Sequence, residues 1–277
     1  GIPELIASDI ETTSYQYQDP IDDVYYLVVA TKIYLGDKIE SVPVKSIPCM
    51  IISEDLTLSE DMMVVHDLYM SGGTIDLNGY ELTVQGNVIQ SGGALKIGEG
   101  KLHICKDYRI QTEGITTEGG VGYTASSGTL FMDDADGSLT VDGSFYMDYS
   151  ISPEDHPSLQ LYGSVQVAEN LSIFTDDTST LDDPLVSRNE TIDIDVYNCN
   201  LHCGGDAEIS ADNVKFVNGQ FLCDGDLYVD IYEGDADREG LGFHGIAAMV
   251  VGGDTCVSGD MRVVGSAYLT YKGDFRF

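Results

Sequence analysis

The sequence has no tryptophan and few basic residues. Of 277 residues, 13 are Lys or Arg and 47 are Asp or Glu, so the formal net charge is −34. Binding to a phosphate backbone depends on Lys and Arg, which excludes nucleic acid as a partner. Anionic membrane surfaces are disfavoured for the same reason. Acidity on this scale favours solubility and attracts Ca²⁺ or cationic surfaces.

Long apolar runs are also missing. The longest, Val24 to Ala30, has the length of a strand, so the sequence predicts no membrane insertion. No segment carries the extended 3.6-residue apolar stripe of a substantial helix. The six cysteines and five histidines show no metal-site spacing, since Cys199 and Cys203 form only one loose pair.

The sequence does contain a repeat, which can be written apolar-x-apolar-x-Gly-Asp-apolar-x-apolar. Nine copies are found, and five of the eight intervals between them are 20 residues. A fixed period of this length is the signature of a repeat architecture. The glycine slot of the successive copies holds His66, Gly86, Lys106, Gly143, Gly163, Gly205, Gly225, Gly253 and Gly273.

Apolar residues alternate with polar ones inside each copy, as in a strand with one buried face. A second, weaker strand precedes several copies, for example at 74–79 and 213–219. Two or three short strands per coil of about 20 residues indicate an all-β fold, a parallel β-solenoid (β-helix) whose coils stack about 4.8 Å apart. Parallel crossovers are almost always right-handed, so we expect a right-handed solenoid.

The slot residues predict a tight corner. We expect glycine where a side chain would collide with the opposite wall or resist a bend. Short polar residues that bond to local backbone suit the following position. That position holds Asp67, Asn87, Asp107, Ser144, Ser164, Asp206, Asp226, Asp254 and Asp274.

Two regions are predicted. Residues 1–47 do not fit the repeat and are expected to form a small N-terminal cap or β element, while 48–277 form the solenoid. Excursions from the coil are expected near 111–127, 170–190 and 230–245, and the interval from Gly163 to Gly205 leaves room for a hidden coil.

The chain begins on Gly1 and stops within a coil whose inward residues Leu269, Tyr271, Phe275 and Phe277 are large. Uncapped strand edges recruit other strands. We therefore expect either a piece of a longer protein or a protomer that assembles end to end into a filament.

A resemblance adds to this interpretation. The segment TIDLNGYELTVQGNVIQSGGALKIGEGKLHICKDYRI (74–110), with its continuation at 123–149, resembles a solenoid segment of very large secreted surface and toxin-delivery proteins of anaerobic Gram-positive bacteria, many of which carry Rhs (YD) repeats. The resemblance covers roughly 75 residues. It implies a structural or adhesive segment and brings no catalytic residues.

Few residues qualify as a site. Polysaccharide hydrolases on β-helices need two carboxylates facing one groove, but the Asp pairs here fall in turns, so no catalytic residues are predicted. Asp134 with Asp136, and Asp235 with Asp237, place alternating carboxylates on tight turns, as Ca²⁺ sites do. Ordinary solvated acidic surface is the alternative.

Two further features concern side chains in equivalent slots. Cys203 and Cys223 occupy one inward slot of successive coils, so they are either buried thiols replacing valine or a disulfide. Tyr69, Tyr146 and Tyr228 share an outward slot with Ile89 and Cys256. This column either stiffens the sheet or forms a docking face.

The expected function is a non-catalytic, extracellular or cell-surface, structural and adhesive module. Its expected partners are a protein or glycan surface, or a second copy of itself. No cofactor is expected, and Ca²⁺ is the one candidate that the acidic turns offer. The alternatives are a carbohydrate-active β-helix enzyme, either a polysaccharide hydrolase or a lyase, and a calcium-dependent carbohydrate-binding module.

Overall fold

The computed structural model describes residues 49–111, 128–149, 158–175, 193–211, 213–231, 241–258 and 261–276, together with the backbone of four short strands nearer the N-terminus. The chain divides into two compact units, Gly1–Pro48 and Cys49–Phe277. In the first unit, β1 (Leu27–Val28) pairs antiparallel with β4 (Val44–Lys45). Likewise, β2 (Thr31–Tyr34) pairs with β3 (Asp37–Glu40).

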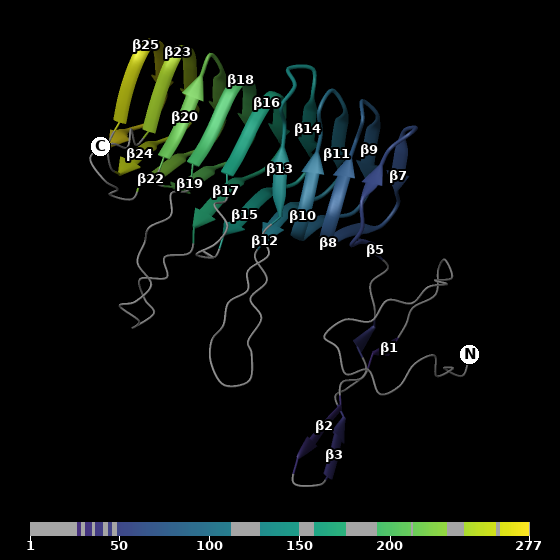
Figure 1. Cartoon of the computed structure of the whole chain (residues 1–277). Helices are drawn as coiled ribbons and strands as arrows, with labels where there is room; N and C mark the ends of the chain where they lie inside the picture. Colours follow the sequence, from purple (N-terminus) through teal and green to yellow (C-terminus); the bar gives the residue numbers. More distant parts are fainter. Residues whose placement is uncertain are drawn as a thin grey trace, which may run out of the picture. The chain divides into compact units, whose positions relative to one another are not determined.

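The second unit confirms the predicted all-β, parallel solenoid architecture. The 22 strands that the structure describes in this unit are linked into one continuous sheet, and strands that meet across neighbouring coils run parallel, as Figure 1 shows. No helix occurs among the residues that the structure describes. Each coil passes through three strand positions, here called columns A, B and C.

The columns are defined by the strands that stack in them. Column A contains β5 (Cys49–Ile52), the first parts of β8 (Asp67–Asp76) and β10 (Val88–Lys96), β12 (Tyr108–Gln111), β15 (Phe145–Tyr149), β17 (Leu171–Thr175), β19 (Ala207–Ala211), β22 (Leu227–Ile231), β24 (Thr255–Ser258) and β26 (Phe275–Arg276). Column B contains β6 (Leu56–Thr57), the second parts of β8 and β10, β13 (Thr129–Phe131), the first parts of β16 (Ser158–Val167) and β18 (Asp193–Cys203), β20 (Asn213–Val217), and the first parts of β23 (Leu241–Val251) and β25 (Met261–Tyr271). Column C contains β7 (Met62–Val64), β9 (Glu81–Val84), β11 (Lys101–Ile104), β14 (Ser138–Val141), the second parts of β16 and β18, β21 (Gln220–Cys223), and the second parts of β23 and β25.

Stacking of identical slots builds the core. Leu68 pairs with Val88 and Val88 with Tyr108 in column A, and all three are fully buried. Aromatic rings stack where they meet: the ring centroids of Tyr108 and Phe145 are 4.9 Å apart, and Phe216 lies between Phe221 and Phe243 at 5.6 and 5.5 Å. Alternation with period 2 thus produces one continuous apolar interior.

The polar slot after the glycine forms a hydrogen-bonded column, here called the corner ladder. In each coil a side-chain oxygen accepts a bond from the backbone N–H of the equivalent residue in the next coil, at 2.7 to 3.3 Å. The turn between columns C and A therefore keeps its amides paired, which buried or bent backbone requires. The ladder contains Asp67, Asn87, Asp107, Ser144, Asn170, Asp206, Asp226, Asp254 and Asp274.

Gly163 and Ser164 do not belong to this corner, contrary to the sequence prediction. Val141 pairs with Val167, which places Glu169 in the glycine slot and Asn170 in the ladder. The segment ending at Gly163 mimics the repeat because its apolar alternation belongs to a column B strand. Gly163 instead turns the chain from column B to column C with φ at +73°, where a Cβ atom would meet the backbone oxygen of Gly137.

The prediction of a hidden coil between Gly163 and Gly205 is also wrong. Leu171 pairs directly with Ala207 in column A, so no further coil lies between them. Parts of two predicted excursions are strands, because β17 covers 171–175 and β23 begins at Leu241. Residues 112–127, 176–192 and 232–240 lie outside the described ranges. In sequence, each of these stretches follows a column A strand and precedes a column B strand.

The physical reason for glycine in the slot differs from the expected one. A Cβ atom on Gly225 would overlap Asp206 Oδ1 of the preceding coil and lie 2.7 Å from the Gly205 oxygen, so the ladder and the backbone of the preceding coil together leave no room for a side chain there. Where Lys106 and Glu169 replace glycine, the ladder bonds that reach the next residue are longer, at 3.2 and 3.3 Å.

The ladder predicts unequal effects of two substitutions at Asp226. Asp226 Oδ1 accepts from the Asp254 N–H at 2.7 Å. Asp226→Ala removes this acceptor and should lower the free energy of unfolding by about 1.5–2 kcal/mol. Asp226→Asn keeps an Oδ1 and removes one charge from a run of four stacked aspartates, so its effect should stay within about 0.5 kcal/mol. Urea denaturation of both variants checks this, and equal losses would contradict an acceptor role.

Candidate functional site

The outward face of column A carries a continuous row, here called the outer row. The strand register confirms that Tyr69, Tyr146 and Tyr228 share it with Ile89 and Cys256. Its members in order are Ile51, Tyr69, Ile89, Arg109, Tyr146, Ser172, Glu208, Tyr228, Cys256 and Arg276.

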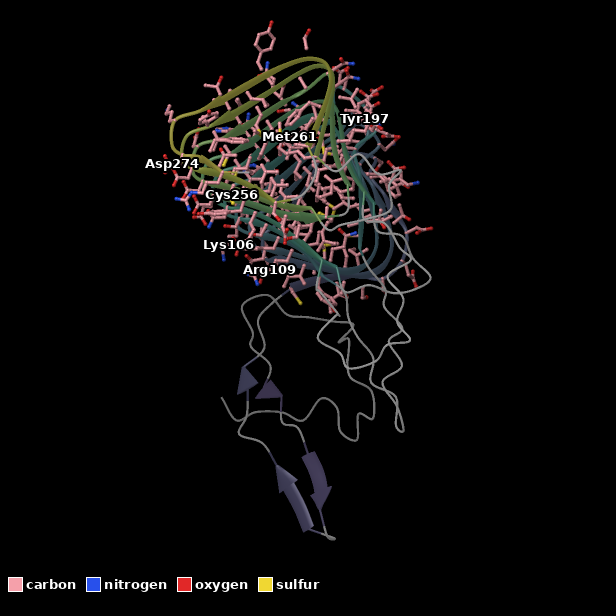
Figure 2. All side chains as sticks on the ribbon, turned by 90° about the vertical axis from the view of Figure 1, so that its left-hand side faces the viewer. Lys106, Arg109, Tyr197, Cys256, Met261 and Asp274 are labelled. Atoms are coloured by element: carbon pink, nitrogen blue, oxygen red, sulfur yellow. The ribbon has the colours of Figure 1, made fainter. Side chains whose placement is uncertain are left out.

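The outer row combines aromatic rings with arginine beside the acidic ladder. Arg109 Cζ lies 4.8 Å from the centre of the Tyr146 ring, a cation–π contact. Its Nη2 also lies 3.4 Å from Asp107 Oδ2 of the ladder. Arg109 and Cys256 lie along one side of the solenoid, and Tyr197 lies on the other (Figure 2). Sequence reasoning identified the tyrosines but missed Arg109, although it occupies the same slot.

Tyr228 is the most exposed described tyrosine of this row, with 47% of its surface accessible. The carboxylate of Asp226, two residues earlier, raises the pKa of the Tyr228 hydroxyl, and Asp206 and Asp254 add to the effect. Negative charge nearby disfavours the phenolate, so the hydroxyl stays protonated and able to donate hydrogen bonds at neutral pH.

A second group of side chains lies on the outward face of column C. His103 lies in β11, Cys105 follows this strand, and Asp142 follows β14 in the next coil. His103 Nε2 lies 3.0 Å from Asp142 Oδ2, and one ligand atom of each residue lies within 4.8 Å of the others. Sequence reasoning missed this trio, because Cys105 and Asp142 are 37 residues apart and only the strand register brings them together.

A related pair occurs farther along the same face. His202 occupies the slot of His103, and its Nε2 lies 3.1 Å from Asp224 Oδ2 of the next coil. Gly204 stands at the position that corresponds to Cys105. The second pair therefore repeats the nitrogen and oxygen donors of the trio without the thiol.

One of the two predicted calcium turns lies in the described structure. Asp134 Oδ1 accepts from the Asp136 N–H at 2.9 Å, and the Asp134 carbonyl oxygen accepts from the Gly137 N–H at 3.2 Å. The Asp134 carboxylate is thus used within its own turn. Asp235 and Asp237 lie outside the described residues, and Ca²⁺ binding stays a prediction at both turns.

Cys203 and Cys223 pair in register in column C, and both are buried free thiols. The Cys203 thiol lies 3.2 Å from the Glu169 oxygen, and the Cys223 thiol lies 3.4 Å from the Gly205 oxygen. Interaction with the Cys203 thiol and burial raise the pKa of Cys223. Both thiols therefore donate to corner carbonyls, and a disulfide between Cys203 and Cys223 stays an alternative prediction. Cys199 is also buried, which raises its pKa to about 12.

The last coil exposes side chains that equivalent slots bury. Tyr271 occupies the inward column C slot of Val251, yet 47% of its surface is accessible, whereas Val251 is fully buried. Its ring lies 5.2 Å from that of Phe275, which is half-buried. Phe277 lies outside the described residues.

No helix in the described ranges has both the length and the apolar character of a membrane span. In comparisons with known proteins, no protein-family model matches the chain, and no curated protein or solved structure shows a match.

Proposed function

We propose that residues 49–277 form a right-handed solenoid with coils of about 20 residues that serves as a non-catalytic structural and adhesive module. The observation that carries this proposal is the corner ladder, in which acidic and amide side chains of successive coils hold the stack together. The ladder uses its polar groups to extend a regular scaffold, and a solenoid of stacked repeats provides a long surface for binding.

The hydrogen bonds that the ladder carboxylates accept favour a scaffold over a glycosidase. A hydrolase needs one carboxyl that holds a proton and a second that acts as nucleophile or base. The Oδ1 atoms of Asp206, Asp226 and Asp254 each accept a backbone N–H bond, and the Oδ1 atoms therefore serve the fold.

The proposed binding surface is the outer row, which offers aromatic faces and hydroxyl groups to a protein or glycan. Tyr and Arg are among the residues enriched at protein interfaces, because each combines apolar area with hydrogen-bond donors. The repeat architecture and the resemblance to secreted surface proteins support placing the module at the cell surface, as part of a large Rhs-type or related protein. A second copy of the chain is the alternative partner.

The proposal predicts binding without turnover. The full chain, incubated with a panel of acidic and neutral polysaccharides, should release no new reducing ends and no unsaturated products. On glycan and protein arrays, a ligand that binds should lose affinity about tenfold or more on Tyr146→Ser or Tyr228→Ser, since interface aromatics contribute the most on truncation. Arrays probed with and without Ca²⁺ separate a calcium-dependent module from a calcium-independent one.

Tyr80→Ser is the matched control, because Tyr80 is 36% exposed and lies outside the outer row, at a turn between columns B and C. Its substitution should leave binding unchanged. Sustained turnover that disappears on substitution of a single carboxylate would establish the enzyme instead. Equal loss of binding in all three tyrosine variants would show that the outer row is not the binding surface.

A further inference from the structure

We propose that His103, Cys105 and Asp142 form a Zn²⁺ site that bridges two successive coils. The imidazole Nε2, the thiolate Sγ and one carboxylate oxygen would be the three protein ligands, with water as the fourth. This inference is independent of the adhesive function, because it concerns the outward face of column C rather than the outer row.

The spacing of the donor atoms suits a tetrahedral ion. Bonds of about 2.0–2.3 Å to zinc place ligand atoms about 3.3–3.7 Å apart. His103 Nε2 and Asp142 Oδ2 are 3.0 Å apart, and the three donors lie within 4.8 Å of one another. The His103 and Asp142 side chains are 37% and 49% exposed, so small rotations suffice to admit the ion.

The backbone beneath the trio is held by the coil stack. The Cys105 N–H donates to the Val84 oxygen and the Asp142 N–H donates to the Ile104 oxygen, each at 2.8 Å. Both bonds belong to the regular spacing between coils. The ligands therefore project from a rigid base, which lowers the conformational entropy that metal binding would otherwise have to overcome.

The chemistry of the donors selects zinc over calcium. Zn²⁺ is bound by sulfur, imidazole nitrogen and carboxylate oxygen, and three protein ligands with an open position are typical of it. Ca²⁺ takes six to eight oxygen ligands. On binding, the Cys105 thiol releases its proton to solvent and the Zn–S bond forms, so thiolate and carboxylate together balance the two positive charges. The net charge of −34 also attracts cations to the surface.

The His202–Asp224 pair provides an internal comparison. It presents a nitrogen and a carboxylate oxygen 3.1 Å apart on the same face, but Gly204 contributes no third ligand. Two exposed donors alone bind zinc weakly, because zinc sites in proteins use three or four protein ligands and each missing ligand removes one bond to the ion. The trio should therefore bind the metal and the pair should not.

Co²⁺ titration of the full chain under reducing conditions tests the proposal, because a thiolate ligand gives cobalt an intense charge-transfer band. We expect the band to saturate at one equivalent and to be displaced by Zn²⁺. Cys105→Ser should abolish it, while His103→Gln and Asp142→Asn should weaken Zn²⁺ binding about tenfold or more, as measured by chelator competition. Zn²⁺ should also raise the melting temperature of the unaltered chain.

Control variants separate this site from adventitious binding. His202→Gln, Asp224→Asn and Cys256→Ser, the last at another partly exposed thiol, should leave the band and the affinity unchanged. Unchanged melting temperatures without metal would show that all variants fold. No charge-transfer band in the unaltered chain, a band that survives Cys105→Ser, or equal losses at the His202–Asp224 pair would each overturn the proposal.

Discussion

Replacing Gly225 by alanine should lower the free energy of unfolding by about 3 kcal/mol, the upper end of the usual cost of overpacking. The added Cβ atom would overlap Asp206 Oδ1 and would lie 2.7 Å from the Gly205 oxygen, so both the ladder bond and the backbone of the preceding coil must shift. Overpacking at a site with backbone on one side is among the most destabilising single changes. Urea denaturation followed by circular dichroism measures the loss.

Gly79→Ala is the matched control for Gly225→Ala. Gly79 has a φ of +83°, but a Cβ atom there would meet nothing within 4 Å. Only the backbone conformation is unfavourable, which costs about 1–2 kcal/mol. A loss at Gly225 no larger than the loss at Gly79 would show that the ladder tolerates a side chain.

A second substitution separates the two causes of the loss at Gly225, which are the clash with Asp206 Oδ1 and the clash with the Gly205 backbone oxygen. At Glu169 the chain tolerates a side chain in the slot, and the ladder residue of the preceding coil there is the shorter Ser144. Asp206→Ser combined with Gly225→Ala should therefore lose less stability than the sum of the two single changes. The rescue should be partial, because the Gly205 oxygen remains.

Phe216→Ala should lower the free energy of unfolding by about 3–5 kcal/mol, the usual range for a buried aromatic side chain. Phe216 is 3% exposed, and its ring stacks with Phe221 within its coil and with Phe243 in the next coil at 5.6 and 5.5 Å. Removing the ring leaves a cavity between two coils. Tyr228→Ala, at a 47% exposed position of the outer row, should change stability by less than about 0.5 kcal/mol.

The loss at Phe216 should also be local. Coils contact only their neighbours, so the stability of a solenoid is close to a sum of nearest-neighbour terms. Hydrogen exchange should show reduced protection at Val214 and Leu241 beside the cavity, with little change at Val88 or Leu102. A uniform loss of protection along the whole stack would instead indicate one cooperative unit.

The repeat by itself determined the architecture. Alternating apolar residues around Leu82, Val84 and Val88 predict strands with one buried face, and their recurrence predicts parallel stacking. Both signals are local, since they depend only on side-chain period and spacing along the chain. The polar corner slot was predicted in the same way for all copies but one. The hydrogen bonds from these side chains to the backbone of the next coil were not predicted.

Only the tertiary structure shows which residues of neighbouring coils lie side by side where a long stretch of sequence separates them. Stretches of variable length separate column A from column B, so sequence distance does not show which residues lie side by side. For this reason Glu169 and not Gly163 takes the glycine slot, and Cys105 lies beside Asp142. The cause of the glycines was hidden for the same reason: the atom that a side chain on Gly225 would strike belongs to Asp206, one coil away.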